Sequence, residues 1–565
     1  MTRNIGIVGA GIAGLHLALY LQKHGVEATL ITDRAPKDYR QSRLLNTVAH
    51  HHVTLTREDY LGVNHWSAPK FHYYYHDHFF NFPQPLRFRG HFSKPSRALD
   101  YRIYLPALME DFERRGGKIE YRRIEEGDIR PLVARFDLLV VATGKGPLGQ
   151  LFTYRPEHTP YSQPQRLLCV GLYTGVRQPD PMNVTLSVSP GHGEMIVIPT
   201  LTFDGVANAL LMENVPGGDM EVLSSLSYDD DRKTFLRAVL EKLEKHHPTT
   251  YDRVDTARFD LAQPQDLLQA GVVPTVRNTV VEFDDGKCAI ALGDVHSVVD
   301  PMMGQGANVA SYAAFVLGEE IVNSDALDAR FCEKVDLKRQ DRVLAASRWT
   351  NVMLQPPSQA LGMLIGAMGG NQALADEFTE NFNYPDLQWD RIATPERIQL
   401  GSTGTPLRRS GHERRLEGHK DALFDRHLPD AQRREPLSVV LRRHPRTVGE
   451  ATSRSEILLL CLPCAAGRRR GALLHLSSVF CRRGGNEGCT PIGHRAESCR
   501  RCSQLLARWG HFLSLCRPRL KSCACRWDAP WRSSRKRGTP APRRRPAQPG
   551  YDRHAWRDRA PGRRA

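Results

Sequence analysis

The stretch that decides the fold is Asn4-Ile5-Gly6-Ile7-Val8-Gly9-Ala10-Gly11-Ile12-Ala13-Gly14, near the start of the 565-residue chain. Its first half, residues 4–9, is a short apolar run typical of a buried strand, and residues 12–24 have the apolar spacing of a helix. Residues 27–32 predict a second strand, which completes a strand–helix–strand unit of about 30 residues. This pattern predicts an α/β fold built on a parallel sheet.

Three glycines in this unit have the spacing of a dinucleotide-binding turn. The first permits the tight turn, the second lets the backbone approach a pyrophosphate, and the third lets the helix pack close to the strand. The helix N-terminus adds free N–H groups and about half a positive charge. The acidic residue expected near the ribose stands one place later than usual, so that contact stays open. The residues expected to bind the dinucleotide are Gly9, Ala10, Gly11, Gly14 and Asp33.

A second glycine-bearing segment lies about 280 residues further along. Gly293-Asp294 follows a buried run, and residues 300–308 open a helix. The segment resembles the Gly-Asp motif of FAD-dependent hydroxylases, in which the aspartate binds the ribityl chain and backbone N–H groups face the flavin ring. A carboxylate accepts hydroxyl hydrogen bonds, and a helix N-terminus stabilises negative charge on the ring. The expected FAD-binding residues here are Gly293, Asp294, Pro301, Gly304, Gln305, Gly306, Ala307 and Asn308.

The middle of the chain changes character. Residues 183–213 alternate apolar and polar side chains between turn signals, which predicts an antiparallel sheet. Amphipathic patterns predict helices at residues 101–115 and 230–246 and a helical region that runs to about residue 390. We expect an FAD-binding domain from residues 1–45, 97–165 and 280–330, a substrate domain from residues 46–96 and 166–279, C-terminal helices at residues 331–400 and a separate tail at residues 401–565.

Charge also divides the chain near residue 400. Residues 401–565 carry 34 Arg and 3 Lys against 13 acidic residues, whereas residues 1–400 carry 41 basic and 49 acidic residues. The acidic body therefore gives no reason to expect nucleic-acid binding. It holds only three of the 12 cysteines, which fits a reducing cytoplasm. No run of 18 or more apolar residues predicts a membrane span, and the glycines in the N-terminal run argue against a signal peptide.

One absence bears on how a flavin would be reduced. Single-component aromatic hydroxylases usually have an Asp-Gly pair, associated with FAD and NAD(P)H handling, where this chain has Ala142-Thr143-Gly144. The absence indicates that the chain does not reduce its own flavin and instead binds reduced FAD as a diffusible co-substrate. Two alternatives stay open: a single-component hydroxylase that uses NAD(P)H, and a basic nucleic-acid-binding protein with a degenerate flavin fold. A flavin-dependent halogenase is disfavoured because no Trp-x-Trp-x-Ile-Pro segment is present.

Longer segments carry a closer family resemblance. They are residues 5–16, 43–50, 95–102, 189–194, 293–308 and 377–397. Through them, residues 1–398 resemble the oxygenase component of the two-component styrene monooxygenases. The resemblance implies a para-hydroxybenzoate-hydroxylase-like FAD domain, an antiparallel substrate-domain sheet above it and C-terminal helices.

The resemblance also implies a reaction and its partners. Reduced FAD and O₂ would form a C4a-hydroperoxide, whose distal oxygen is transferred to the vinyl group of styrene or oxidises indole. The oxidising power belongs to the cofactor, and the protein binds, orients and excludes water. An NADH-dependent flavin reductase, separate or fused, is the expected partner of a cytoplasmic enzyme with no membrane contact, and a homodimer is one expected assembly.

The family's substrate pocket lies beside the flavin ring. An apolar pocket with few polar groups suits styrene, which has no hydrogen-bonding atom. Carried over residue by residue, the pocket would contain Leu44, Leu45, Asn46, Val48, His50, Tyr73, His76 and Ser96. Arg43 and Arg97 are candidates for the FAD phosphates or the ring edge. A single His or Tyr is more often a structural residue, and no residue is expected to act as an acid or base.

The run of histidines and tyrosines at residues 72–78 could suggest a metal site. We expect none, because its spacing matches no good ligand set and because alternation along a strand would split the histidines between the two faces.

Residues 401–565 lie outside the resemblance, and their Arg-rich composition with little amphipathic order predicts disorder. One interpretation is a nucleic-acid-binding arm. Another is a zinc module, although 34 residues between its cysteine pairs are many for a zinc ribbon; its ligands would be Cys461, Cys464, Cys499 and Cys502. The preferred interpretation is a frameshift that replaced a fused flavin reductase, because GC-rich DNA read out of frame yields Arg, Pro, Gly and Cys with almost no Lys.

Overall fold

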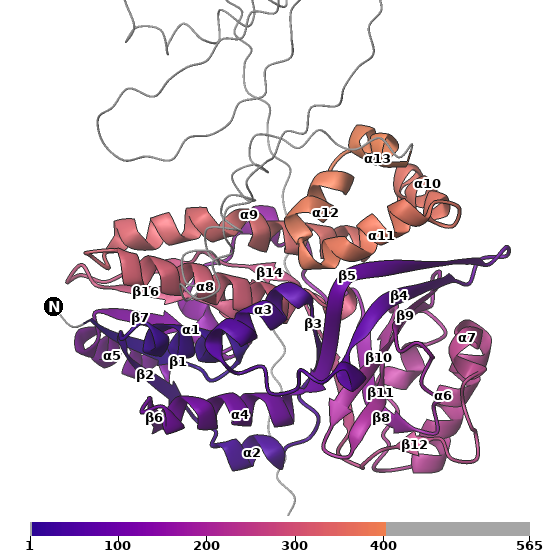
Figure 1. The fold of residues 1–565 in the computed structure, drawn as a ribbon, viewed down its shortest axis with the longest axis horizontal. Helices are drawn as coiled ribbons and strands as arrows, with labels where there is room; N and C mark the ends of the chain where they lie inside the picture. Colours follow the sequence, from indigo (N-terminus) through magenta and orange to yellow (C-terminus); the bar gives the residue numbers. More distant parts are fainter. Residues whose placement is uncertain (1–2, 403–565) are drawn as a thin grey trace, which may run out of the picture. The chain divides into compact units, whose positions relative to one another are not determined.

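A computed structural model describes residues 3–402 of the chain (Figure 1). The zinc, nucleic-acid and frameshift hypotheses for the tail concern residues beyond 402 and lie outside the described residues. Within residues 3–402, no helix is both long and apolar enough to cross a membrane.

The first sheet has six strands and carries the N-terminal strand–helix–strand unit. All neighbours pair in parallel except the edge pair β15–β16. Val8 lies between Ile31 and Val141 in register, and all three are buried, as a parallel sheet covered on both faces requires. The strand order is β15 (Val280–Glu282), β16 (Cys288–Ala291), β7 (Leu138–Val141), β1 (Asn4–Val8), β2 (Glu27–Thr32) and β6 (Lys118–Tyr121).

Helices cover both faces of this sheet. The larger core lies under α1, α4 and α8 and contains Leu15, Leu108 and Leu317. The smaller core, on the opposite face, is closed by α5 through Ile129 and Leu132. The helices of this half are α1 (Ile12–Lys23), α2 (Pro36–Arg40), α3 (His52–Leu61), α4 (Tyr101–Arg114), α5 (Ile129–Arg135), α8 (Gly306–Asn323) and α9 (Ala329–Met353).

The second sheet is larger and mostly antiparallel. Its exceptions are the parallel pair β4–β9 and a short parallel contact between β10 and β5. The main path is β12 (Asp260–Leu261), β8 (Leu167–Thr174), β11 (Gly205–Asn214), β10 (Gly193–Thr202), β9 (Val184–Ser189), β4 (Tyr73–Phe80), β5 (Leu86–Asp100) and β3 (Thr47–His50), with β13 (Leu267–Gly271) also on β8 and a separate small pair of β14 (Thr275–Val276) and β17 (Ser297–Val298).

The two faces of the second sheet meet different neighbours because side chains alternate along a strand. On β10, Met195 and Val197 belong to a core closed by α6 (Arg232–His246), which lies with α7 (Pro248–Tyr251) on one side of the sheet (Figure 1). Ile196 and Ile198 point to the other face, toward the first half of the molecule. Four helices pack near β4 and β5: α10 (Gln359–Met368), α11 (Gln372–Glu380), α12 (Pro385–Ile392) and α13 (Pro395–Ser402).

Two helices that the sequence predicts, one in each half of the molecule, are confirmed to within a few residues. The helix expected at residues 101–115 is α4, and the one expected at residues 230–246 is α6. The proposed domain boundaries stay a prediction; the single long strand β5 crosses the one placed at residues 96–97.

Candidate functional site

The turn between β1 and α1 is shaped by glycines that have no room for a side chain. Gly9 has φ +113°, and a Cβ there would lie 2.3 Å from the Ala142 carbonyl oxygen. A Cβ on Gly14 would lie 2.0 Å from the Gly9 carbonyl oxygen. Gly11 differs, because a Cβ there would meet nothing within 4 Å. Gly9 and Gly14 therefore close the turn, while Gly11 presents bare backbone to open space at the N-terminus of α1.

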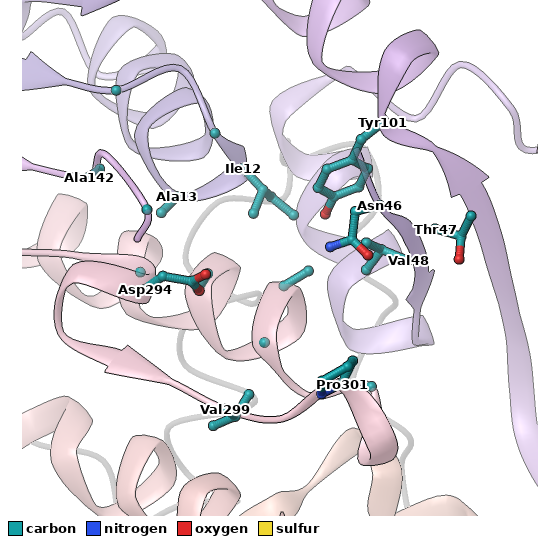
Figure 2. Close-up of a pocket in the computed structure, with 18 of the residues that line it drawn as sticks. Ile12, Ala13, Asn46, Thr47, Val48, Tyr101, Ala142, Asp294, Val299 and Pro301 are labelled. Atoms are coloured by element: carbon teal, nitrogen blue, oxygen red, sulfur yellow. The ribbon is translucent and has the colours of Figure 1, made fainter. Parts of the chain in front are cut away.

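The second glycine segment meets this turn directly. A Cβ on Gly293 would lie 3.1 Å from the Cβ of Ala13, although the two residues are 280 positions apart. The neighbouring Asp294 side chain enters the same space, and Figure 2 shows its carboxylate opposite Asn46. Burial raises the pKa of Asp294, with Lys145 acting in the opposite sense. A hydroxyl-bearing ligand in this space would supply the donors that the carboxylate lacks among residues 3–402.

These segments border one continuous cavity of about 700 Å³. This is the size of pockets that enclose a small-molecule ligand or cofactor. One end, which we call the polar end, lies against the β1–α1 turn. The other, the apolar end, lies against the second sheet. Residues that line the polar end include Gly9, Gly11, Asp33, Arg34, Arg122, Arg123 and Thr143.

The apolar end is walled by inward-facing residues from several strands of the second sheet together with the segment before α8. Ile196 and Ile198 of β10 belong to this wall. Two histidines also line the cavity, His51 and His76, and burial acts against the charged form of each. It lowers the pKa of His51 to about 3 and that of His76 well below its ordinary value. Both are therefore neutral near pH 7. The other wall residues include Leu168, Val170, Leu186, Leu211, Met302, Met303 and Phe382.

This donor set fits a dinucleotide such as FAD. Backbone N–H groups at the start of α1 suit a pyrophosphate, and three arginines line the same end. The Asp294 carboxylate lies between the two ends, where it could accept hydrogen bonds from a sugar-like chain. The first turn of α8, with Gly306 and Ala307, borders the region where a ring system would lie. The cradle at Gly11, which a side chain would fill, is the structural feature that favours this ligand.

The structure brings most of the sequence-predicted residues to the cavity. Asn46, Val48, Tyr73 and His76 line it, as do the following predicted cofactor residues: Gly9, Ala10, Gly11, Asp33, Gly293, Asp294, Pro301, Gly304, Gly306 and Ala307. Gly14 lies beneath the turn instead, against Gly9. Leu44 and Leu45 do not line the cavity. Leu44 is packed in the core of the second half, and Leu45 packs against the core of the first half.

His50 and Arg97 are placed away from the cavity, in a fully buried network around Glu58. The Nδ1 atom of His50 lies 2.6 Å from the Glu58 carboxylate, and its Nε2 atom lies 3.0 Å from the Tyr101 hydroxyl. Arg97 donates to the other Glu58 oxygen. Neither residue lines the cavity, where we expected contact with substrate or flavin, because Glu58 holds both side chains and Tyr101 also binds His50. Tyr101 lines the cavity in their place.

Three further predicted residues support the wall from behind. The Ser96 hydroxyl lies 3.2 Å from Nδ1 of His51. Asn308 accepts from the His51 N–H and donates to the Ala49 carbonyl, so it ties the start of α8 to the β3–α3 junction. Gln305 donates to the backbone carbonyls of Met303 and Phe382, two residues of the cavity wall. Arg43 lies elsewhere and forms an exposed ion pair with Asp229 at 3.0 Å.

The expected split of the histidines between strand faces is wrong. His76 and His78 are two residues apart on β4, so they share a face; both are buried, and their ring centroids lie 6.1 Å apart. His78 stacks on Phe88 at 4.5 Å. In residues 3–402, no group of three or more His, Cys, Asp or Glu side chains is placed to hold a metal ion.

Sequence reasoning missed the arginines of the polar end and most of the apolar wall. Arg34 follows Asp33 directly and could have been found from that position. Arg122 and Arg123 follow β6, at the carboxyl edge of the parallel sheet, where ligands of such sheets bind. His51 was not predicted as a cavity residue because β3 ends at His50 and the backbone turns into α3 there, which interrupts the alternation of side chains along the strand.

Comparisons with known proteins agree with this geometry. The family model "Styrene monooxygenase A putative substrate binding domain" matches residues 144–253. Styrene monooxygenase StyA of Pseudomonas sp and StyA of Pseudomonas fluorescens are each 51% identical over 403 residues, which is 70% of this chain and 97% of each relative.

Solved structures that are similar to this chain include two flavoproteins. The flavin-dependent brominase Bmp2 is 14% identical, with a TM-score of 0.45 over 75% of this chain and 99% of that protein. A flavoprotein/dehydrogenase from Cytophaga hutchinsonii is 14% identical, with a TM-score of 0.48 over 71% of this chain and 99% of that protein.

The identity to the Pseudomonas proteins spans nearly their whole length. The chain therefore belongs to the styrene monooxygenase family, as a flavin-dependent monooxygenase.

Proposed function

We propose that this chain is the oxygenase component of a two-component system, which uses reduced FAD and O₂ to epoxidise styrene-like alkenes. The observation that carries the proposal is the continuity of the cavity, in which a backbone-lined polar end opens into an apolar end without a wall between them. The same cavity could admit indole, a flat bicyclic substrate of similar width.

Each group along the cavity would have a distinct part in binding. The turn at Gly9 and Gly11 would hold the pyrophosphate, and Asp294 would accept hydrogen bonds from the ribityl hydroxyls. The N-terminus of α8 would stabilise negative charge on the reduced ring. When it is bound in reduced form, FAD supplies the reaction with O₂ that puts one oxygen atom into the substrate and releases the other as water.

The apolar wall would orient the alkene and exclude water. Styrene offers no hydrogen-bonding atom, so its affinity would come from burial against Ile196, Ile198 and Leu211. Neutral His51 and His76 add no charge to this wall, since burial lowers the pKa of both. Asn46, which we predicted for the substrate pocket, also lines the cavity and adds a polar but uncharged side chain.

We propose that the electrons come from an NADH-dependent flavin reductase, as a second chain. Support for this comes from Ala142-Thr143-Gly144, which line the cavity where single-component hydroxylases usually have an Asp-Gly pair.

The test combines the full-length protein with chemically reduced FAD, oxygen and styrene, without any reductase. We expect styrene oxide with one epoxide at most per reduced flavin. Reduced FAD and oxygen without protein, or with the Asp294→Ala variant, should give none above background. Production of no epoxide by the wild-type protein, while it binds FAD, would reject the proposed reaction.

A second measurement separates the alternative of a single-component hydroxylase. The protein is mixed with oxidised FAD and NADH, and NADH absorbance is followed. We expect no consumption above that of free flavin until a flavin reductase is added. Fast NADH oxidation by the chain alone would reject the two-component proposal while leaving a monooxygenase reaction intact.

A further inference from the structure

Two buried carboxyl groups lie directly behind the cavity wall, outside the machinery described above. Asp300 immediately precedes Pro301, Met302 and Met303, which all line the cavity. Glu213 lies on β11, two residues after the wall residue Leu211. Neither carboxyl residue has any exposed surface. Buried charged groups are normally paired, so the partners of these two matter.

The oxygen atoms of this pair lack donors. One Asp300 oxygen accepts from the Met302 N–H at 3.1 Å. The other Asp300 oxygen and both Glu213 oxygens have no hydrogen-bond partner among the described residues. The two carboxyl groups nevertheless interact with each other. Two ionised carboxylates in contact could not donate to one another and would repel in a dry site, whereas one proton between them supplies the missing donor.

In the described part of the chain, Arg166 is the cation near the pair, and it is already bound. Glu194 lies opposite Glu213 in the β10–β11 register. Arg166, just before β8, binds Glu194 through both carboxylate oxygens at 2.6 and 2.9 Å and also donates to the Leu354 carbonyl. The other neighbour of Glu213 across the sheet is the apolar Leu168 of β8. Three carboxyl groups thus face one guanidinium, which is committed to the first.

We propose that Glu213 and Asp300 share one proton at neutral pH, and that this acid pair positions the Pro301–Met303 segment along the cavity. Glu213 is a positioning residue that acts through Asp300, since it touches neither cavity end. Burial, followed by the neighbouring Asp300, raises the pKa of Glu213 well above its ordinary value, in agreement with this geometry.

The first test detects the shared proton through the pH dependence of the protein's stability. If the folded chain keeps a proton that the unfolded chain loses above about pH 4.5, then the free energy of unfolding decreases as the pH rises. Glu213→Gln keeps a hydrogen-bond donor but cannot titrate. We therefore expect the unfolding constant of the wild type, divided by that of Glu213→Gln, to rise about tenfold per pH unit between pH 5 and pH 8. A ratio that is flat with pH would overturn the shared proton.

The matched control is Glu194→Gln, on the facing strand. Glu194 forms an ion pair with Arg166, so Glu194→Gln should be less stable than the wild type at pH 7. Its stability relative to the wild type should not increase between pH 5 and pH 8. Infrared spectroscopy of the folded wild type at pH 7.5 gives an independent measurement that does not depend on a folded variant. A carboxylic-acid C=O band supports the pair, and its absence overturns it.

The second test concerns positioning, through the affinity for oxidised FAD. Glu213→Gln should keep the wild-type Kd within about threefold, whereas Glu213→Leu, which leaves Asp300 without a donor, should weaken it by about tenfold or more. Equal affinities for both variants would remove the positioning role. None of these measurements uses styrene or a reductase, so their outcome is distinguishable from failure of the proposed function.

Discussion

The two ends of the cavity are built from different materials. The centre of the polar end is backbone: glycines of the β1–α1 turn that leave no room for side chains or expose bare N–H groups, all within about six residues, with arginines around them. The apolar end is side chain, collected from strands of the second sheet and from the segment before α8. The turn of the first end is fixed by local sequence and has no room for a Cβ at Gly9 or Gly14, whereas the second end depends on summed contacts, so its substitutions should have graded effects.

The largest effect is expected at the polar end, from a pair of glycine substitutions. Gly14→Ala puts a Cβ 2.0 Å from the Gly9 carbonyl, so the turn itself must shift. We expect it to weaken FAD binding at least about 100-fold, a loss of about 2.7 kcal/mol, and to lower the Tm by several degrees.

Its matched partner is Gly11→Ala, which adds a Cβ into open space. This variant should keep the wild-type Tm, because the methyl group touches no other part of residues 3–402. It should still lose FAD affinity, because the methyl group occupies space that the ligand needs. Thermal unfolding and flavin fluorescence titration report the two quantities. Equal loss of stability in both variants would contradict the distinction between closing the turn and facing the ligand.

A smaller effect is expected at the apolar end. Ile198→Ala removes part of the wall, and we expect kcat/KM for styrene to fall about tenfold while FAD affinity changes less than twofold. Val197→Ala, one residue earlier on β10, faces α6 and should lower the Tm without changing kcat/KM. If Ile198→Ala weakened FAD binding as strongly as it lowered turnover, the two ends would not be separable.

The smallest effect concerns the neutrality of the wall. Burial holds the pKa of His76 below its ordinary value, so the unfolded chain binds the proton first as the pH falls below about 6.5. The stability that depends on neutral His76 is complete above that pH and is lost below it. The Tm of His76→Phe should therefore fall less than the wild-type Tm when the pH is lowered from 7 to 5. An NMR signal of protonated His76 at pH 6 would contradict this.

The same contrast explains what could be predicted from the sequence. The β1–α1–β2 unit and the residues Gly9, Gly11 and Asp294 were found because their signals are local and their backbone demands are strict. Alternation along residues 183–213 predicted strands, but it could not say which face of β10 meets the flavin half, because that depends on partners far away in the chain. Ile196 and Ile198 were therefore missed.

Errors in the predicted site have the same origin. His50 and Arg97 have the residue types that a binding site would use, yet both bind Glu58, a residue that no motif singled out. A carboxylate on α3 thus decides the role of side chains on β3 and β5. Assigning such residues to a site requires the three-dimensional arrangement of several elements, which the spacing of residues in the sequence does not reveal.

The contact between Ala13 and Gly293 has a consequence for how the protein is made. Ribosomal synthesis delivers the first of these residues long before the second, and non-local contacts of this kind form late in folding. A nascent chain shorter than about 310 residues would carry a complete glycine turn with nothing to close over it. Cofactor capture should therefore begin only once α8 has left the ribosome, which makes flavin uptake a reporter of finished folding.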